Sequence, residues 1–379
     1  MEQVCAMASS IFNPENPHQS IEELRAAGIH GILFDFGFFV SAESILYDRI
    51  KNTHLFSPEK KRASYQKVIA EFTAHEFLPS IARLPFVNVM ADLKELDVVE
   101  LNGLIAQIDR DCIRACEKIG CSTVIVQPLV VGVTHKEAWE IQKEFYLSLA
   151  SHCQKQDTRI LLTNQCRSHN GHLIRGVCAD GETAAAWVDA LNRACGMERF
   201  GFCLDAGNCN LCGQNMQRMA AALGARIRAV ILSENDGHSM ARLLPFTSAS
   251  MRRSTMDWTS LVRGLRQIGF DGTLILDTVD TTVSFSPLLQ PSLVPVYKAV
   301  LDYFMLQINI ENDLRKYDRL VLFGAGNMCR NYMKCYGESY PPLFTCDNNP
   351  DLWGTIFEGL EVKSPEALKR LPPNCGVII

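Results

Sequence analysis

The chain has 379 residues, of which 47% are hydrophobic, and a formal net charge of −5. This length and hydrophobic content predict a sizeable core, with one barrel-sized domain and a smaller one. A mildly acidic chain has no electrostatic footprint for a polyanion, so we expect no nucleic-acid partner. We see no apolar run of 18 residues and no signal peptide, which predicts a cytoplasmic protein without a membrane partner.

The cysteines support a reducing compartment. The chain has 15 of them, an odd number, and most lie within apolar strand or helix patterns. We therefore expect reduced thiols in the core rather than a framework of disulfides.

Strand-like and helix-like segments alternate over residues 1–290. The helix-like segments carry apolar residues three and four positions apart, as between Leu101 and Ile119. This alternation predicts an α/β fold, a (β/α)8 TIM barrel. The eight strand-like runs are Val4–Ser10, Gly31–Phe36, Leu78–Leu84, Thr123–Gln127, Arg159–Asn164, Gly201–Asp205, Ala229–Ser233 and Thr273–Asp277.

A second α/β pattern follows a connecting helix predicted over residues 291–316. Over residues 317–379, a buried strand runs into the turn Gly324-Ala325-Gly326, a helix reaches Tyr336, and a strand ends at Asp347. This pattern predicts a small Rossmann-like domain that is very short or stops inside its sheet.

The same turn suggests a site for NAD or another nucleotide. Asp347 follows Gly326 by about 20 residues, near where a ribose-binding acid lies in such domains. However, Cys329 holds the third glycine position, and strand-Gly-x-Gly turns also serve close packing. Gly324, Gly326 and Asp347 are thus candidate cofactor-binding residues, with plain packing as the alternative.

Two apolar runs end in polar and acidic residues. Gly201–Asn208 and Ile231–Gly237 each read as a buried strand that presents functional groups at its carboxyl end. In a barrel these ends lie on one face. The pair therefore predicts the rim of a functional site.

From about Cys5 to Asp280 the chain resembles the xylose isomerase-like TIM barrels, a family of sugar phosphate isomerases and epimerases. The resemblance implies a divalent ion, manganese or zinc, held by a Glu, an Asp, a His and a Glu from strands five to eight. It also implies that the metal polarises a carbonyl oxygen while the glutamates move protons. The motifs that carry the resemblance are Gly201–Asn208, Glu234–Gly237, Leu243–Thr247 and Gly269–Asp277.

Carried over to this chain, that ligand set is incomplete. The strand-five glutamate falls on Thr163, followed by Asn164, and the strand-seven histidine falls on Ile231. Asp205 keeps the strand-six carboxylate, and Asp277 replaces the strand-eight glutamate. Because a hard cation needs several oxygen or imidazole ligands, Asp205 and Asp277 alone predict a weak, mostly hydrated metal site.

Other histidines implied by the resemblance are also replaced. Their positions hold Arg83, Gln127, Asn208 and Arg242. A guanidinium stays protonated and is a poor metal ligand. We hypothesise that Arg83 and Arg242 point into the barrel mouth and neutralise its acids as the ion would; alternatively, both lie on the rim in water.

A replacement zinc site is the other hypothesis for this face. Cys166, His169 and His172 follow strand five, while Cys209 and Cys212 follow strand six. Thiolates and imidazoles on neighbouring barrel loops are suitable zinc ligands. The alternative is that the thiols pack and the histidines are solvated.

Three functions remain open: an isomerase or epimerase with Asp205 and Asp277 as acid and base, a non-catalytic carbohydrate-binding barrel, or a scaffold for a nucleotide-binding C-terminal domain. The expected ligand is a sugar or sugar phosphate, and a homo-oligomer is also open. Candidate substrate-binding residues are Asp35, Arg83, Gln127, Asn164, Asn208, Glu234 and Arg242.

Overall fold

The structure is a computed structural model that describes residues 5–7, 11–40, 59–85, 98–129, 135–169, 172–247 and 256–379. The chain divides into two units, Met1–Met305 and Leu306–Ile379. The boundary falls within helix α11 (Val294–Leu314), inside the predicted connecting segment. The finer domain limits predicted from the sequence remain a prediction.

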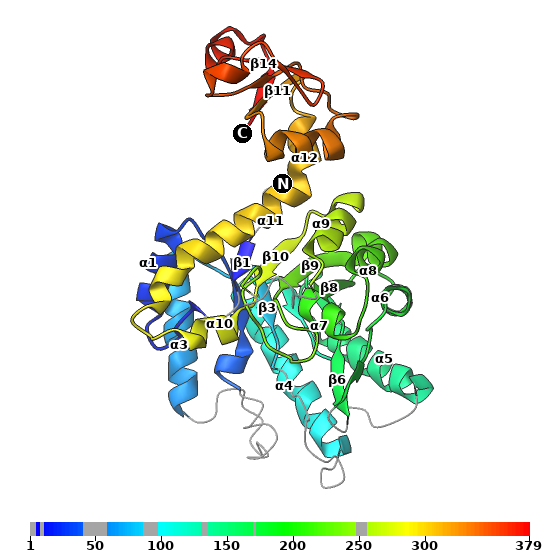
Figure 1. Ribbon diagram of the computed structural model, residues 1–379. Helices are drawn as coiled ribbons and strands as arrows, with labels where there is room; N and C mark the ends of the chain where they lie inside the picture. The colour runs from blue at the N-terminus through cyan, green and yellow to red at the C-terminus, as the bar shows by residue number, and fades with distance from the viewer. Residues whose placement is uncertain are drawn as a thin grey trace. The chain divides into compact units, whose positions relative to one another are not determined.

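Eight parallel strands form a closed barrel in the first unit (Figure 1). β1 pairs with both β10 and β2, so the sheet has no free edge. Each predicted strand overlaps one of these eight, which confirms the TIM barrel. In order round the barrel the strands are β1 (Cys5–Met7), β10 (Thr273–Leu276), β9 (Ile227–Leu232), β8 (Phe200–Asp205), β5 (Arg159–Thr163), β4 (Thr123–Ile125), β3 (Ile81–Arg83) and β2 (Gly31–Asp35).

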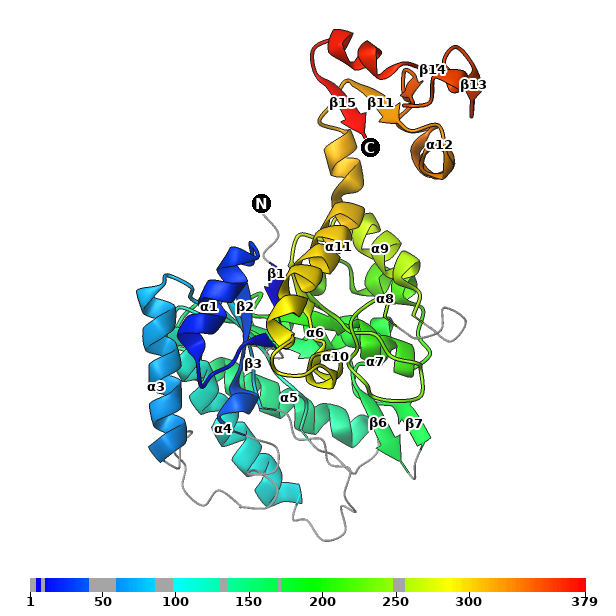
Figure 2. The ribbon, with the colours of Figure 1, turned by 60° about the vertical axis from the view of Figure 1, so that its left-hand side comes forward.

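Helices cover the outside of the barrel (Figures 1 and 2). The apolar stripe of α4 is buried, as its spacing predicts, and Asp180 caps α6 by accepting a hydrogen bond from the Thr183 amide. The longer helices of this unit are α1 (Pro17–Ala26), α3 (Glu59–Ala74), α4 (Val98–Lys118), α5 (His135–His152), α6 (Gly181–Cys195), α8 (Met216–Leu223) and α9 (Trp258–Gln267).

Shorter elements follow the carboxyl ends of three barrel strands. β6 (Cys166–His169) and β7 (His172–Arg175) form an antiparallel hairpin after β5. The helix α7 (Ala206–Leu211) follows β8 directly, and α10 (Val279–Ser284) follows β10. These segments stand where the loops of a TIM barrel build its functional face.

A layer of buried apolar side chains fills the barrel. Because side chains alternate along a strand, the residue two positions beyond each inward-facing member also points inward. This rule places Asp35, Arg83, Gln127, Asp205 and Asp277 above the layer, at the carboxyl ends. The layer consists of Leu33, Ile81, Ile125, Leu161, Cys203, Ala229, Ile231 and Ile275.

The second unit contains a five-stranded sheet in the order β13-β14-β12-β11-β15. β11 pairs in parallel with β12 and β15, while β13 pairs antiparallel with β14. The strand, helix and strand predicted from the sequence are present as β11, α12 and β12. The elements are β11 (Arg319–Phe323), α12 (Asn327–Tyr336), β12 (Thr345–Cys346), β13 (Ile356–Phe357), β14 (Leu360–Lys363) and β15 (Cys375–Ile378).

The described part of the chain contains no helix that is both long and apolar enough to cross a membrane.

Candidate functional site

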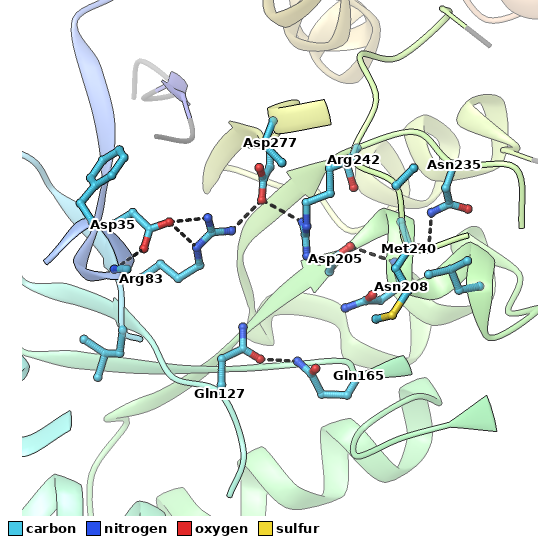
Figure 3. Close-up of a pocket in the computed structure, with 18 of the residues that line it drawn as sticks. Asp35, Arg83, Gln127, Gln165, Asp205, Asn208, Asn235, Met240, Arg242 and Asp277 are labelled. Carbon is cyan, nitrogen blue, oxygen red and sulfur yellow. Dashed lines mark hydrogen bonds and ion pairs between the residues drawn. The ribbon is translucent and has the colours of Figure 1, made fainter. Parts of the chain in front are cut away.

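The carboxyl ends of the barrel strands open onto a pocket of about 460 Å³ (Figure 3). Its walls combine charged and amide side chains with a few apolar ones. Seven of the nine residues predicted to be catalytic or substrate-binding line it: Asp35, Arg83, Gln127, Asp205, Asn208, Arg242 and Asp277. Gly37, Phe38, Val40, Leu84, Gln165, Gly207, Leu211, Ser233, Asn235, Met240, Ala241 and Val279 complete the lining.

Arg83 joins the acids at the ends of two strands (Figure 3). Its Nε and Nη2 donate to Asp35 Oδ2 at 3.1 and 2.5 Å, and its Nη1 donates to Asp277 Oδ2 at 2.6 Å. Asp35 and Arg83 are also paired in the register of β2 and β3. Burial would lower the pKa of the Arg83 guanidinium, but Asp35 and Asp277 outweigh it and raise that pKa.

Arg242 joins Asp277 to a third acid. Its Nη1 donates to Asp277 Oδ2 at 2.8 Å, and its Nη2 lies 3.3 Å from Asp205 Oδ2. Its backbone amide donates to Asp280 Oδ2 at 2.7 Å, which holds this loop against the start of α10. The arginine therefore reaches the pocket from a loop, whereas Arg83 reaches it from a strand.

Asp277 is the centre of this network, because both guanidinium groups donate to the same carboxylate oxygen. Its residue is 1% exposed. Burial by itself would raise the pKa of the carboxyl, but the charges and hydrogen bonds of Arg242 and Arg83 outweigh it and hold that pKa below its ordinary value. A carboxylate stabilised in this way is a weak proton acceptor.

The charged groups thus alternate in the order Asp35, Arg83, Asp277, Arg242, Asp205. The side chain of Arg83 is 16% exposed and that of Arg242 is 30% exposed. The hypothesised contact between both arginines and the acids is present, and the alternative, in which both lie in water on the rim, is wrong.

The second carboxylate oxygens of Asp35 and Asp205 accept hydrogen bonds from the backbone. Asp35 Oδ1 accepts from the Gly37 amide at 2.8 Å, and Asp205 Oδ1 accepts from the Asn208 amide at 2.9 Å. Each acid therefore ends its strand and caps the turn that follows.

The residues of the pocket do not fit the four-ligand metal site that the resemblance implies. Ile231 lies in the apolar layer, and Thr163 is buried at the end of β5. Within the described residues, no three donor atoms from His, Cys, Asp or Glu converge at the pocket. Each of the three acids lies instead within ion-pair distance of an arginine.

Two predicted substrate-binding residues lie outside the lining. The Asn164 amide donates to the Asp205 carbonyl at 2.9 Å and accepts from the Asp205 amide at 2.8 Å, so it joins β5 to β8. Glu234 accepts hydrogen bonds from the Phe246 amide and from Trp258 Nε1. Both side chains are buried against the rest of the chain. The sequence analysis predicted them in the pocket wall, and that placement is wrong, because neither lines the pocket.

The lining residues that the sequence analysis did not name as candidates include Gln165, Asn235 and Met240. Gln165 donates to Gln127 Oε1 at 2.5 Å, and Asn235 donates to the Gly207 carbonyl at 3.0 Å. Gln165 lies two positions beyond Thr163, so the alternation along β5 was a usable signal. Asn235 and Met240 lie beyond the end of β9, where no such rule applies.

The hypothesised zinc site at the hairpin has no matching geometry in the described residues. Cys166 and Cys212 are buried in an apolar cluster with Ala179 and Leu211. Burial raises the pKa of the Cys212 thiol to about 12, so that it stays protonated and is a poor ligand. His172 is exposed, and the side chain of His169 lies outside the described residues.

In the second unit, Asp347 closes the glycine turn. Its Oδ2 accepts from the Ala325 amide and its Oδ1 from the Asn349 amide, both at 2.8 Å. These backbone hydrogen bonds lower the pKa of its carboxyl. Gly324 has φ +111°, a conformation that favours glycine. The acid and the glycines are brought together as predicted, but the acid binds the chain itself.

Comparison with known proteins agrees with the barrel. The family model described as xylose isomerase-like TIM barrel matches residues 105–299. A D-tagatose 3-epimerase-like protein is similar in structure, with TM-score 0.56 and 14% identity over 81% of this chain and 98% of the other.

Two further structures are similar at the same level. D-allulose 3-epimerase from Methylomonas sp. in complex with D-allulose has TM-score 0.55 and 13% identity, covering 80% of this chain and 98% of its own. The IOLI protein with a binding zinc atom has TM-score 0.54 and 15% identity, covering 81% and 98%. At these identities the likeness shows the fold. No curated protein sequence compared with the chain matches it.

Proposed function

The chain belongs to the xylose isomerase-like TIM barrel family, and from this premise we propose that its barrel binds a small neutral carbohydrate in the pocket without a divalent ion. Structural neighbours of the barrel include sugar epimerases, one of them solved with D-allulose. We therefore expect a ligand of the same class as the D-allulose of this neighbour, held by protein side chains and not by a metal ion.

The arginine network is the observation that carries the proposal. Arg83 and Arg242 both donate to Asp277, at 2.6 and 2.8 Å. A metal ion at the same carboxylate would have to displace two hydrogen-bonded guanidinium groups and face their positive charge. We infer that the arginines replace the ion in holding the acids together, and that the metal site expected from the resemblance is lost.

The remaining polar groups suit hydroxyls. Gln127, Gln165, Asn208 and Asn235 line the pocket with amides that contain both donors and acceptors, part of which bond within the wall itself. A sugar hydroxyl also donates and accepts, so it can bond to either the oxygen or the nitrogen of an amide. The volume of about 460 Å³ lies in the usual range for small-molecule sites and admits a monosaccharide with water.

The charges favour a neutral sugar over a sugar phosphate. The lining contains three carboxylates and two guanidinium groups, all of which belong to the network. A phosphate would compete with acids that already hold both arginines at hydrogen-bond distance, next to an excess negative charge.

A metal-free epimerase is the second candidate, because the structural neighbours include sugar epimerases. Proton abstraction next to a carbonyl needs a base, and Asp205 and Asp277 are the predicted pair. The lowered pKa of Asp277 makes it a weak base. We therefore favour a carbohydrate-binding protein over a metal-free epimerase.

Calorimetric titration with D-allulose and D-tagatose, with EDTA and then with Mn²⁺, tests the proposal. We expect binding that neither addition changes, and no conversion of the sugar. Gln165→Ala should weaken binding about tenfold, which is about 1.4 kcal/mol. Gln267→Ala, at an exposed position at the end of α9, should leave binding unchanged. Binding that requires Mn²⁺ would contradict the proposal, and conversion abolished by Asp277→Asn would favour the epimerase.

We further propose that the second unit is Rossmann-like and that nucleotide binding there is a separate candidate function. The N-terminus of α12 at Gly326 has no side-chain cap, which suits a phosphate. Thermal unfolding with and without NAD tests it: a rise in Tm that Gly326→Asp abolishes would support it, and no rise would oppose it. A cytoplasmic location stays a prediction.

A further inference from the structure

A cluster of two histidines and a glutamate joins two outer helices of the barrel. Glu71 lies in the last turn of α3, His75 follows four residues later, and His18 lies in the first turn of α1. Residues four apart share one face of a helix, so Glu71 and His75 point the same way. The helices lie side by side in both views (Figures 1 and 2). None of the three residues lines the pocket.

Three donor atoms converge in this cluster. His18 Nδ1 lies 3.0 Å from His75 Nε2 and 3.3 Å from Glu71 Oε2, and His75 Nε2 lies 3.4 Å from Glu71 Oε2. A tetrahedral zinc ion with bonds of about 2.0–2.1 Å holds its ligand atoms about 3.3 Å apart. A point at bonding distance from all three atoms therefore exists without moving the backbone.

A fourth residue supports one of the ligands. Glu22 Oε1 lies 3.5 Å from His75 Nδ1, the ring nitrogen that does not face the cluster. A carboxylate on that side favours a proton on Nδ1, so that the lone pair of Nε2 faces the cluster, where a metal would replace its hydrogen-bond contact with His18 Nδ1. Metal-binding histidines are commonly oriented by such a carboxylate.

The guanidinium of Arg25, which also lies on α1, contacts other groups than the three ligand atoms. Arg25 donates to the backbone carbonyl of His75 and lies over the Phe77 ring. The cluster thus differs from the pocket, where guanidinium groups bind the carboxylates themselves. Its side chains are within reach of solvent: His18 is 62% exposed, Glu71 31% and His75 18%.

We propose that His18, Glu71 and His75 bind one zinc-type divalent ion on the outside of the barrel, with a fourth position open to water. Two imidazoles and a carboxylate form a ligand set that zinc prefers, and three protein ligands leave one tetrahedral position free. The bound ion links α1 to α3 and stabilises the folded state, because it binds the folded arrangement only.

The test is a titration of chelator-stripped protein with Zn²⁺, followed by calorimetry and thermal unfolding. We expect one ion per chain, a Kd in the micromolar range or below, and a rise in Tm. Co²⁺ should give the absorption bands of a four-coordinate ion. Binding weaker than millimolar would overturn the proposal.

Variants assign the site. His18→Ala and His75→Ala should each weaken Zn²⁺ binding at least 100-fold, and Glu22→Gln about tenfold, the effect typical of a residue that orients a ligand. The control His152→Ala removes an exposed histidine that bonds only near the end of α5, and it should change nothing. His18 is exposed, so its variant should fold even if His75→Ala does not.

The outcome that would contradict the outer zinc site is Zn²⁺ binding in the pocket. Zn²⁺ binding that survives His18→Ala and is lost in Asp205→Asn would place the ion in the barrel mouth, which would overturn this proposal and also the proposed metal-free pocket. Zn²⁺ binding lost in His18→Ala, with sugar binding unchanged, would support the outer site and leave the proposed function standing on its own test.

Discussion

The pocket and the outer cluster of His18, Glu71 and His75 both bring carboxylates next to nitrogen-containing side chains, with different chemical results. In the pocket these side chains are the guanidinium groups of Arg83 and Arg242, which stay protonated and form ion pairs. In the outer cluster they are imidazoles, which have a lone pair for a metal. We propose that the first arrangement takes the place of a cation and that the second offers a site for one.

The comparison shows why a family site does not follow from a family fold. The barrel places Asp205 and Asp277 on the carboxyl-end face, as the resemblance implies. The side chains on neighbouring strands and loops then decide whether these acids bind an ion or an arginine. Function lies in that local chemistry.

The largest effect is expected from Arg83→Ala. It removes the guanidinium that pairs with Asp35 and one of the two that pair with Asp277, and removing one partner of a buried ion pair costs about 3 kcal/mol or more. Urea unfolding at pH 7 should show this loss of free energy of unfolding. The exposed control Arg218→Ala should change it by less than about 0.5 kcal/mol. Equal effects of the two variants would mean that the network does not hold the pocket together.

Gly207→Ala should have the next largest effect. A Cβ at this position would lie 2.5 Å from Ser233 Oγ and 3.1 Å from Asn235 Nδ2, inside the pocket wall. We expect a loss of about 2 kcal/mol in free energy of unfolding from this overpacking, together with weaker sugar binding. Gly213→Ala is not a matched control, because Gly213 has positive φ; Gly103→Ala, where a Cβ meets open space, should be neutral or stabilising.

The ion pairs of Asp277 predict a smaller, pH-dependent effect. The pKa of this carboxyl is lowered in the folded state, so its contribution is fully present above the ordinary value of 3.8 and is lost as the pH falls through the lower folded value. Unfolding measured from pH 6 down to pH 3 should show a drop in stability that is shallower in Asp277→Asn. An identical slope in both proteins would contradict the pairing.

The smallest effect is expected from His18→Ala without metal. This side chain is 62% exposed, so its loss should change the free energy of unfolding by less than about 0.5 kcal/mol. With Zn²⁺ at 100 times the Kd, the wild-type protein should gain about 2.7 kcal/mol that the variant lacks. A large loss for the metal-free variant would mean that the cluster is a structural hydrogen-bond group.

Particular residues show how far the sequence could predict the site. Asp35, Arg83 and Asp205 end strands whose alternation fixes their direction, and all line the pocket. Asn164 and Glu234 also end or follow strands, yet both turn to partners in the chain. A single sequence does not tell which polar group at a strand end satisfies the backbone and which faces a ligand.

The outer cluster was missed for a related reason. Glu71 and His75 form a short helical pair that by itself is common on exposed helices. Their third partner, His18, is separated from His75 by 57 positions and comes from another helix. Only the packing of α1 against α3 brings it within bonding distance.

The sequence by itself predicted the barrel, because eight alternations of strand and helix favour a (β/α)8 arrangement, and it predicted that polar strand ends such as Asp205 lie on one face. Tertiary structure decided which charges pair: Arg83 and Asp277 are 194 positions apart, and they meet because β3 and β10 end at the same mouth. Local patterns set the direction of a side chain, whereas its partner depends on closure of the whole sheet. That closure brings the acids and the arginines together, as hypothesised from the sequence.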